Sequence, residues 1–216
     1  MPPFPVKPAA SPARGFDIVV IAASAGGPRT LRDIFQLLPA NFPAPVVVVQ
    51  HLAASPPSSL VEFLGRDCAL PVQWVDRPEQ LQGGCVYLAP PDRHLAIRAG
   101  NICETYSGPR VNFAIPAADP LFTSAATEFG SRTLGVVLTG RLRDAAAGAR
   151  AIRDAGGVVV VQEPTTCVAD GMPTATIEQG SACFILSPRG IASAIITLVM
   201  VARSPGIFGM AAARQN

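Results

Sequence analysis

An apolar run that stops on a serine, two glycines and a proline constrains the fold of this chain more than any other stretch. Residues 18–28 read IVVIAASAGGP. The valines and isoleucines predict a buried strand, and Pro28 with the apolar residues that follow predicts a helix that begins at once. Ser24 therefore falls in the turn between a strand and a helix. Because the first N–H groups of a helix lack intrahelical partners, they can stabilise the oxyanion that forms when a neighbouring hydroxyl attacks a carbonyl.

The local sequence of this turn leaves three interpretations open. A nucleotide-binding loop is disfavoured, because G-x-G-x-x-G is absent and neither Gly-Lys-Ser nor Gly-Lys-Thr follows. A tight turn in which Ser24 caps the helix is the simplest interpretation. A nucleophile turn is the third, since residues 22–26 read AASAG, one glycine short of G-x-S-x-G. Gly26 and Gly27 would then leave the approach to the serine free of side chains.

Length and composition predict one domain with a large core. The chain has 216 residues, of which 49% are hydrophobic, and this is enough for one well-buried sheet. We expect the domain to cover residues 16–202. Repeated proline and alanine at 1–15 predict a disordered leader or the remnant of a linker, and residues 203–216 predict a flexible tail.

Charge, length and cysteine spacing exclude several classes of function. The net charge is +2 and the basic residues are scattered, which argues against a nucleic-acid surface. The chain start has no signal-peptide pattern, and the apolar stretch at 191–202 is shorter than the roughly 20 residues that span a bilayer. We therefore expect a cytoplasmic protein without membrane insertion. Five cysteines without C-x-x-C spacing and two histidines indicate neither disulfides nor a metal site, and no cofactor is predicted.

Strand and helix patterns alternate along the chain, which predicts an α/β fold with a doubly wound, mainly parallel sheet. Two alternating segments at 95–98 and 102–106 predict an antiparallel hairpin insertion. After the first strand, further strands are expected at 46–50, 72–75, 85–88, 133–138, 158–162 and 182–186. After the first helix, further helices are expected from Pro56 or Pro57, from Asp119, and at 145–155, 174–179 and 189–202.

Three polar residues, Ser24, His51 and Asp144, each follow an apolar strand of this sheet. Because the carboxyl ends of parallel strands share one edge, where ligands bind in such folds, we expect the three to converge. In a triad, His51 would take the proton of Ser24 near neutral pH, and Asp144 would hold the imidazole in the right tautomer. The alternative for Asp144 is a helix N-cap acid. His94 enters a strand instead of leaving one, so we expect a structural hydrogen-bonding role for it.

Several motifs in one order and spacing resemble a known family. They are ASAGG at 23–27, QH at 50–51, APPDRH at 89–94, VVLTG at 136–140 with Asp144, and CVADGMP at 167–173. Together they make residues 17–201 similar to the catalytic domain of the bacterial chemotaxis protein-glutamate methylesterases, the CheB family. The resemblance implies a cytoplasmic serine hydrolase that demethylates glutamate methyl esters on the cytoplasmic helices of chemoreceptors and also deamidates certain glutamines.

The resemblance also implies a role for each site residue. Ser24 would be the nucleophile, His51 the base and then the acid, and Asp144 the residue that orients the histidine. Backbone N–H groups at Ala25 and Arg141 would donate to the oxyanion. The full set expected to bind the oxyanion or the substrate is Ala25, Gly26, Gly140, Arg141 and Arg143.

The chain departs from the family at its start and in two loops. Family members usually carry an N-terminal phosphorylatable receiver domain, whereas about 15 residues precede the sheet here, so we expect such control to come from a separate receiver domain in trans. The usual Arg-Pro-Ser before an acidic residue is replaced by IPAAD at 115–119, and the Thr-Gly-Met-Gly-x-Asp-Gly loop reads TGRLRDA at 139–145. Arg141 and Arg143 either attract acidic receptor helices in place of the missing arginine or are solvated loop residues.

Hypotheses of different classes follow from these features. The first is a methylesterase-type hydrolase, which is favoured because all three triad residue types are present. The second is a catalytically weak interaction domain that binds receptor-like helices or a signalling partner, which is favoured by the altered loops. A third is an esterase that acts on another carboxylic ester or amide.

Overall fold

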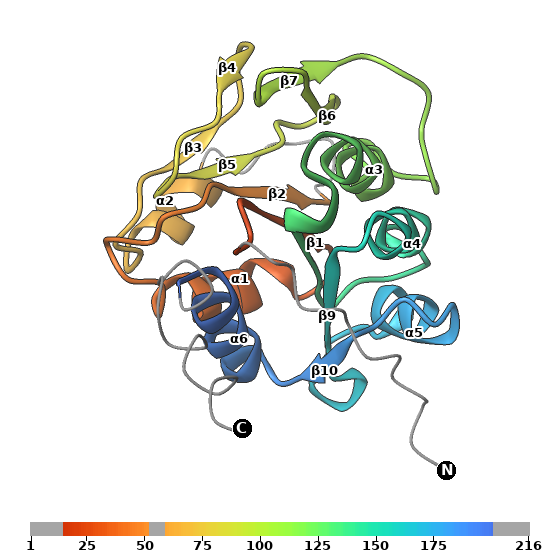
Figure 1. Cartoon of the computed structure of the whole chain (residues 1–216). Coiled ribbons are helices and arrows are strands. Elements are labelled where there is room, and N and C mark those ends of the chain that lie inside the picture. The colour runs from red at the N-terminus through yellow and green to blue at the C-terminus, as the bar shows by residue number, and fades with distance from the viewer. Residues whose placement is uncertain (1–14, 52–58, 201–216) are drawn as a thin grey trace, which may run out of the picture.

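Seven parallel strands form the central sheet, in the order β10-β9-β8-β1-β2-β5-β3 (Figure 1). The computed structural model describes residues 15–51 and 59–200. The predicted leader up to residue 14, the predicted tail at 203–216 and the proline-capped start of the second predicted helix lie outside the described residues. The strands of the sheet are β1 (Ile18–Ala23), β2 (Val46–Gln50), β3 (Val72–Trp74), β5 (Val86–Leu88), β8 (Thr133–Val137), β9 (Val158–Gln162) and β10 (Phe184–Leu186).

The chain builds this sheet outwards from β1 in two directions. It first adds β2, β3 and β5 on one side of β1, and then returns to add β8, β9 and β10 on the other side. The strand order therefore reverses between β1 and β8. In open parallel sheets, ligands bind outside the carboxyl ends of the strands at such a reversal.

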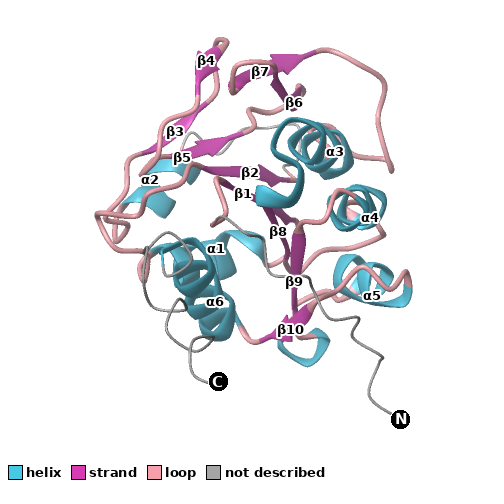
Figure 2. Cartoon of the chain, viewed as in Figure 1, coloured by secondary structure: helices cyan, strands magenta, loops and turns pink. Residues whose placement is uncertain are grey.

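Helices cover both faces of the sheet (Figure 2). Along β1, Val19 and Ile21 pack into the core that α1, α2 and α6 cover, whereas Ile18 and Val20 pack into the core that α3, α4 and α5 cover. Because both faces are buried, the strands read as continuous apolar runs. The predicted doubly wound α/β fold is confirmed. The helices are α1 (Gly27–Phe35), α2 (Leu60–Gly65), α3 (Ala118–Phe129), α4 (Ala146–Asp154), α5 (Gly171–Glu178) and α6 (Pro188–Met200).

The predicted antiparallel hairpin is confirmed as β6 (His94–Arg98) and β7 (Ile102–Tyr106). Together with β4 (Glu79–Gln80) it forms a small sheet of its own, in the order β4-β7-β6. β4 is only two residues long, so its sequence carried no periodic pattern from which to predict it. This sheet packs against α3, where the N–H of Ile97 donates to the hydroxyl of Ser124 at 2.9 Å.

The helices expected from residues 119 and 189 begin one residue earlier, and two further helix starts differ for a reason that the backbone shows. The helix expected from residue 145 begins at Ala146, because Ala145 has a left-handed φ of 76°. The helix expected from residue 174 begins at Gly171. Pro173 then lies in the first turn of α5, where the missing N–H breaks no helical hydrogen bond. Both shifts lie at the carboxyl edge of the sheet.

The apolar segment near the end of the described chain is a docked helix, as its length predicted. Ile191, Ile195 and Val199 of α6 are buried against the sheet. Across residues 15–51 and 59–200, no helix is long and apolar enough to cross a membrane.

Candidate active site

Register brings Ser24 and His51 together just beyond two neighbouring strands. The parallel pairing of β1 with β2 aligns Ala23 with Gln50, the last residue of each strand. The N–H of His51 continues the ladder by donating to the carbonyl of Ala23 at 2.8 Å. On the other side of β1, the N–H of Ser24 donates to the carbonyl of Thr139 at 2.9 Å. The residues after the strands are therefore held as firmly as the strands themselves.

Asp144 holds the imidazole of His51. The Nε2 atom of His51 lies 2.7 Å from Oδ2 of Asp144, which leaves Nδ1 as the ring nitrogen available to a hydroxyl. Ser24 and His51 line one cavity of about 150 Å³, the Ser24 cavity. The side chain of His51 is 17% exposed and that of Asp144 is 1% exposed. The histidine therefore opens to the cavity, whereas the carboxylate behind it is sealed from water.

Hydrogen bonds keep the buried carboxyl group of Asp144 acidic. Burial alone would raise its pKa, but hydrogen bonds from His51, the Ala118 N–H and the Asn112 amide outweigh burial and hold the pKa below its ordinary value. The Ala118 nitrogen lies 2.6 Å from Oδ2, and Nδ2 of Asn112 lies 3.1 Å from Oδ1. An ionised carboxylate at this place favours the proton on Nε2 of His51 and stabilises an imidazolium.

Asn112, which the sequence analysis did not predict, bridges two carboxylates. Its Nδ2 donates to Asp119 Oδ2 at 2.6 Å as well as to Asp144. Burial raises the pKa of Asp119. The hydrogen bond from the N–H of Gly148 lowers this pKa and the nearby charge of Asp144 raises it, and the net shift is upward. Asn112 has a φ of 49°, a conformation that asparagine tolerates better than most residues. One feature of the sequence could have pointed to Asn112. It lies in a loop shortly before Asp119 at the start of a helix, and asparagine is common in turns.

Two buried side chains fix the turn at residues 24–27, the Ser24 turn. Nε2 of Gln50 donates to the carbonyls of Ser24 and His51, both at 2.9 Å. Oγ1 of Thr139 donates to the carbonyl of Ala25 at 2.8 Å. Gln50 and Thr139 both fall within the motifs at 50–51 and 136–140, but the spacing of residue types does not reveal which side chains reach back to the turn.

The predicted oxyanion donors fall into two groups. In the described part of the chain, the backbone N–H groups of Ala25 and Arg141 donate no hydrogen bond, so both remain available to a ligand. The N–H of Gly140 donates to the carbonyl of Ala169 at 2.8 Å and is therefore not available. Gly140 matters instead for close packing, since a Cβ atom there would come within 2.8 Å of the Cβ of Ser24.

Gly26 is required in the Ser24 turn for two reasons. Its φ of 82° lies in the left-handed region that side chains disfavour. A Cβ atom at this position would also come within 2.6 Å of the side chain of Val168. The predicted place of Gly26 beside the nucleophile therefore reflects backbone shape and close packing.

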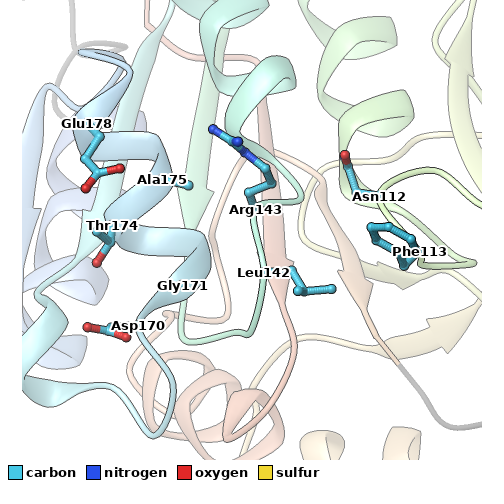
Figure 3. A pocket seen from close by; sticks show the side chains of 9 residues that line it. All are labelled: Asn112, Phe113, Leu142, Arg143, Asp170, Gly171, Thr174, Ala175 and Glu178. Atoms are coloured by element: carbon cyan, nitrogen blue, oxygen red, sulfur yellow. The ribbon is translucent and has the colours of Figure 1, made fainter.

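The two arginines of the altered loop line different spaces. Arg141 lines the Ser24 cavity, together with Arg110 from another loop. Arg143 lines a larger neighbouring space of about 470 Å³ that runs along α5, the α5 groove (Figure 3). The two spaces adjoin, because they share three lining residues, Asn112, Phe113 and Leu142.

His94 lies outside this site and has the hydrogen bonds of a structural residue, as predicted. Its side chain is buried, with 1% exposure of the residue. Nδ1 accepts a hydrogen bond from the N–H of Ala117 at 3.2 Å, and Nε2 lies 2.9 Å from the carbonyl of Pro109. Both ring nitrogens therefore serve the backbone, and neither is left to transfer a proton.

The cysteines do not offer an alternative nucleophile. All five are unpaired, and burial raises the pKa of Cys103 to about 12 and that of Cys167 to about 11. These thiols therefore stay protonated at neutral pH. Across the described residues, no group of three or more His, Cys, Asp or Glu side chains could hold a metal ion.

Comparison with known proteins shows that the chain is similar to methylesterases. Residues 19–195 match the family model described as CheB methylesterase. The protein-glutamate methylesterase/protein-glutamine glutaminase 2 of Anaeromyxobacter dehalogenans is 41% identical over 174 residues, which are 80% of this chain and 51% of that protein. The protein-glutamate methylesterase/protein-glutamine glutaminase of Thermotoga maritima is 39% identical over 191 residues, which are 87% of this chain and 56% of that protein. The chain thus spans about half the length of these curated relatives.

A solved structure has the same fold over nearly its whole length. The crystal structure of the Thermotoga maritima CheB methylesterase catalytic domain superposes with a TM-score of 0.82 at 38% sequence identity. The match covers 85% of this chain and 99% of that one. The described fold is therefore the fold of that catalytic domain.

Proposed function

The chain belongs to the CheB methylesterase family, and from that premise we propose that it hydrolyses methyl esters of glutamate side chains in proteins. The names of its relatives support this activity and a second one, the deamidation of glutamine side chains. The observation that carries the proposal is the 2.7 Å hydrogen bond between Nε2 of His51 and Oδ2 of Asp144, beside a cavity that Ser24 also lines.

In the proposed reaction Ser24 is the nucleophile. Its Oγ attacks the ester carbonyl carbon while its proton passes to Nδ1 of His51. Asp144 accepts the hydrogen bond from the opposite ring nitrogen and stabilises the imidazolium that forms. The carbon–oxygen bond to the methoxy group then breaks, and methanol leaves with the proton from His51. His51 then deprotonates a water molecule, which attacks the acyl carbon. The bond from that carbon to Oγ of Ser24 breaks, Ser24 regains its proton from His51, and the glutamate carboxylate is released.

The proposed oxyanion donors are the backbone N–H groups of Ala25 and Arg141. Their lack of another acceptor in the described residues supports this role. Donors that are fixed before the reaction lower its barrier by several kcal/mol in related chemistry. Gly26 and Gly140 would contribute by letting the backbone approach the reacting atoms, and Arg143 by binding substrate in the α5 groove.

We propose methylated cytoplasmic helices of chemoreceptors as the substrate, and the cytoplasm as the place of action. The names of the relatives support the glutamate ester, and the receptor follows from the resemblance to chemotaxis methylesterases. Control by a separate phosphorylatable receiver domain, acting in trans, is part of the same proposal.

A fluorophosphonate probe tests the nucleophile, and methanol release tests the substrate. We expect the probe to label the wild-type protein and not the Ser24→Ala variant. We also expect the wild-type protein to release methanol from a methylated receptor helix. Labelling of both proteins to the same extent would contradict the assignment of Ser24.

A catalytically weak interaction domain is the second candidate, and the backbone around Asp144 favours it. Leu142 and Ala145 have φ values of 64° and 76° at positions where the family usually carries glycine. Each such conformation costs on the order of 1 kcal/mol for a residue with a side chain. Binding of a methylated helix without any methanol release or probe labelling would decide for this candidate.

A further inference from the structure

Two adjoining spaces of unequal size lie at the carboxyl edge of the sheet. The Ser24 cavity has a volume of about 150 Å³, and the α5 groove one of about 470 Å³. Sites that enclose a whole ligand usually measure about 300–1,000 Å³. The Ser24 cavity therefore takes the reacting end of one side chain, and the rest of a substrate extends beyond it. The α5 groove is the space into which it can extend.

Exposed apolar side chains separate the two spaces. Phe113 is 83% exposed and Leu142 is 59% exposed, and Figure 3 shows both on the side of the groove opposite α5. Their φ values of 66° and 64° are unfavourable for large side chains. Two strained, solvent-exposed apolar residues beside a reactive cavity are typical of a surface that binds a partner.

The opposite wall of the groove is acidic. Asp170 immediately precedes α5, and Thr174 and Glu178 follow it at intervals of four residues, so the three lie along one side of the helix (Figure 3). This ridge is about 12 Å long, given the rise of a helix. In the described residues, neither acidic side chain makes a hydrogen bond or an ion pair. Arg143 is the one cation among the residues that line the groove.

The Ser24 cavity has the opposite charge. Arg110 and Arg141 line it, and none of its lining residues is acidic. A ligand that occupies both spaces therefore meets positive charge at the nucleophile, then apolar side chains, and then two carboxylates. This order of charges determines which end of a bound ligand lies in the Ser24 cavity and which end lies in the α5 groove.

We infer that the α5 groove binds the part of an amphipathic substrate helix that lies beside the esterified glutamate. Apolar side chains of that helix pack on Phe113 and Leu142, and a lysine or arginine on the same helix face pairs with Asp170 and Glu178. A helix fits because its surface ridges pack against the ridge of α5. Its side chains three or four residues apart also share one face. The inference rests on the proposed function, since it names what surrounds the ester.

Synthetic helical peptides with one glutamate methyl ester test this inference. Each peptide carries a single lysine at a position on the ester's face, three, four, seven or eight residues away on either side. Affinity is measured with Ser24→Ala protein, which binds without turnover, and methanol release is measured with wild-type protein. We expect one lysine position to bind more tightly than the same peptide with glutamate there, by about threefold to tenfold.

The charge preference should reverse in a protein with Asp170→Lys and Glu178→Lys. Both residues are exposed, so the protein is expected to fold. The matched control is Glu62→Lys, an exposed residue that lines neither space. In this control the preference for lysine should stay as in the wild type.

The apolar contact is tested by Phe113→Ser and Leu142→Ser, with Leu37→Ser as the control for an exposed leucine elsewhere. We expect each groove variant to weaken peptide binding by about tenfold and to raise KM for the peptide by a similar factor. Because Phe113 and Leu142 also line the Ser24 cavity, hydrolysis of a single-residue glutamate methyl ester is measured alongside, and we expect it to fall by a smaller factor than hydrolysis of the peptide.

The outcomes separate failure of the groove from failure of the reaction. If wild-type protein releases no methanol even from the single-residue ester, the proposed function fails, and the affinities still decide the groove. If the groove and control variants bind the peptides equally, the inference is overturned. It is also overturned if the groove variants lose binding of a separate receiver domain, or lose self-association, while peptide affinity stays unchanged.

Discussion

The two histidines of this chain occupy opposite environments. His94 enters a strand, is buried, and has both ring nitrogens within hydrogen-bond distance of backbone atoms. His51 follows a strand, has one ring nitrogen on a buried carboxylate, and lines the cavity that Ser24 also lines. The same side chain therefore stabilises a loop in one place and is poised to transfer a proton in the other. The difference lies in which partners occupy the ring nitrogens.

The largest effect is expected from His51→Ala. This change removes the proposed base, so turnover of a glutamate methyl ester should fall by about 10⁴-fold or more. The melting temperature should fall only modestly, because the buried Asp144 loses one partner but keeps the hydrogen bonds from Ala118 and Asn112. Methanol release and thermal unfolding measure the two quantities. Equal loss of activity in His51→Ala and His94→Ala, with both proteins folded, would overturn the choice of base.

Asp144→Asn should have the next largest effect. The amide cannot stabilise an imidazolium and can hold His51 in the wrong tautomer, so turnover should fall by about 10³-fold. Fluorophosphonate labelling should slow in parallel, because it depends on the same activated serine. A variant that is labelled at the wild-type rate would show that Asp144 acts only as a structural acid at the start of α4.

His94→Ala should act on stability and not on chemistry. The change leaves the N–H of Ala117 and the carbonyl of Pro109 without their side-chain partner, which should lower the free energy of unfolding by about 2–4 kcal/mol. Turnover per folded molecule should stay within about threefold of the wild type. Urea unfolding and active-site titration separate the two. A large loss of turnover at full stability would remove the contrast between the histidines.

Asn112→Gly tests whether the hydrogen bond from Asn112 to Asp144 affects proton transfer by His51. Glycine accepts the φ of 49° without strain, so the variant removes the amide and keeps the backbone. Turnover should fall by about tenfold, as is usual when a supporting hydrogen bond to a reactive group is lost. The acid limb of the pH–rate profile should move to higher pH, because a hydrogen bond that lowers the pKa of Asp144 is gone.

The matched control is Asn101→Gly, which changes an asparagine with a φ of 61° in the turn of the β6–β7 hairpin. This residue lines neither the Ser24 cavity nor the α5 groove. Its pH–rate profile should match that of the wild type. The same shift in both variants would mean that backbone stiffness, and not the amide of Asn112, sets the profile.

The smallest effect concerns stability in acid. Because the pKa of Asp144 is lowered in the folded state, its ionised form stabilises the fold above the ordinary pKa, and this contribution is lost as the pH falls through the lowered value. Burial raises the pKa of Asp119, so its contribution is full below the ordinary pKa and is lost as the pH rises through the raised value.

Urea unfolding at stepped pH measures these opposite contributions. On acidification below about pH 5, the wild-type protein should lose stability relative to Asp144→Asn. It should gain stability relative to Asp119→Asn over the same steps. If the free energy of unfolding changes with pH in the same way in the wild-type protein and in Asp144→Asn, the carboxylate of Asp144 is not stabilised in its ionised form.

Much of the fold could be predicted from local patterns. The apolar run at 18–23 and the strands at 46–50 and 158–162 match the structure closely, because strands buried on both faces read as nearly continuous apolar runs. Helix starts were predicted less well. Ala145 has a left-handed backbone that the sequence pattern did not reveal, and α5 was expected only from residue 174 although Pro173 lies inside its first turn.

The order of residue types along the chain determined, by itself, that three polar groups would follow three strands of one sheet. It could not determine which ring nitrogen of His51 meets Asp144, or that Asn112 would stand between two carboxylates. Those contacts join residues from 7 to 93 positions apart. Hydrogen bonds depend on distances of a few tenths of an ångström and on direction. Only the packed chain sets these quantities, whereas strand and helix patterns arise from near neighbours in the sequence.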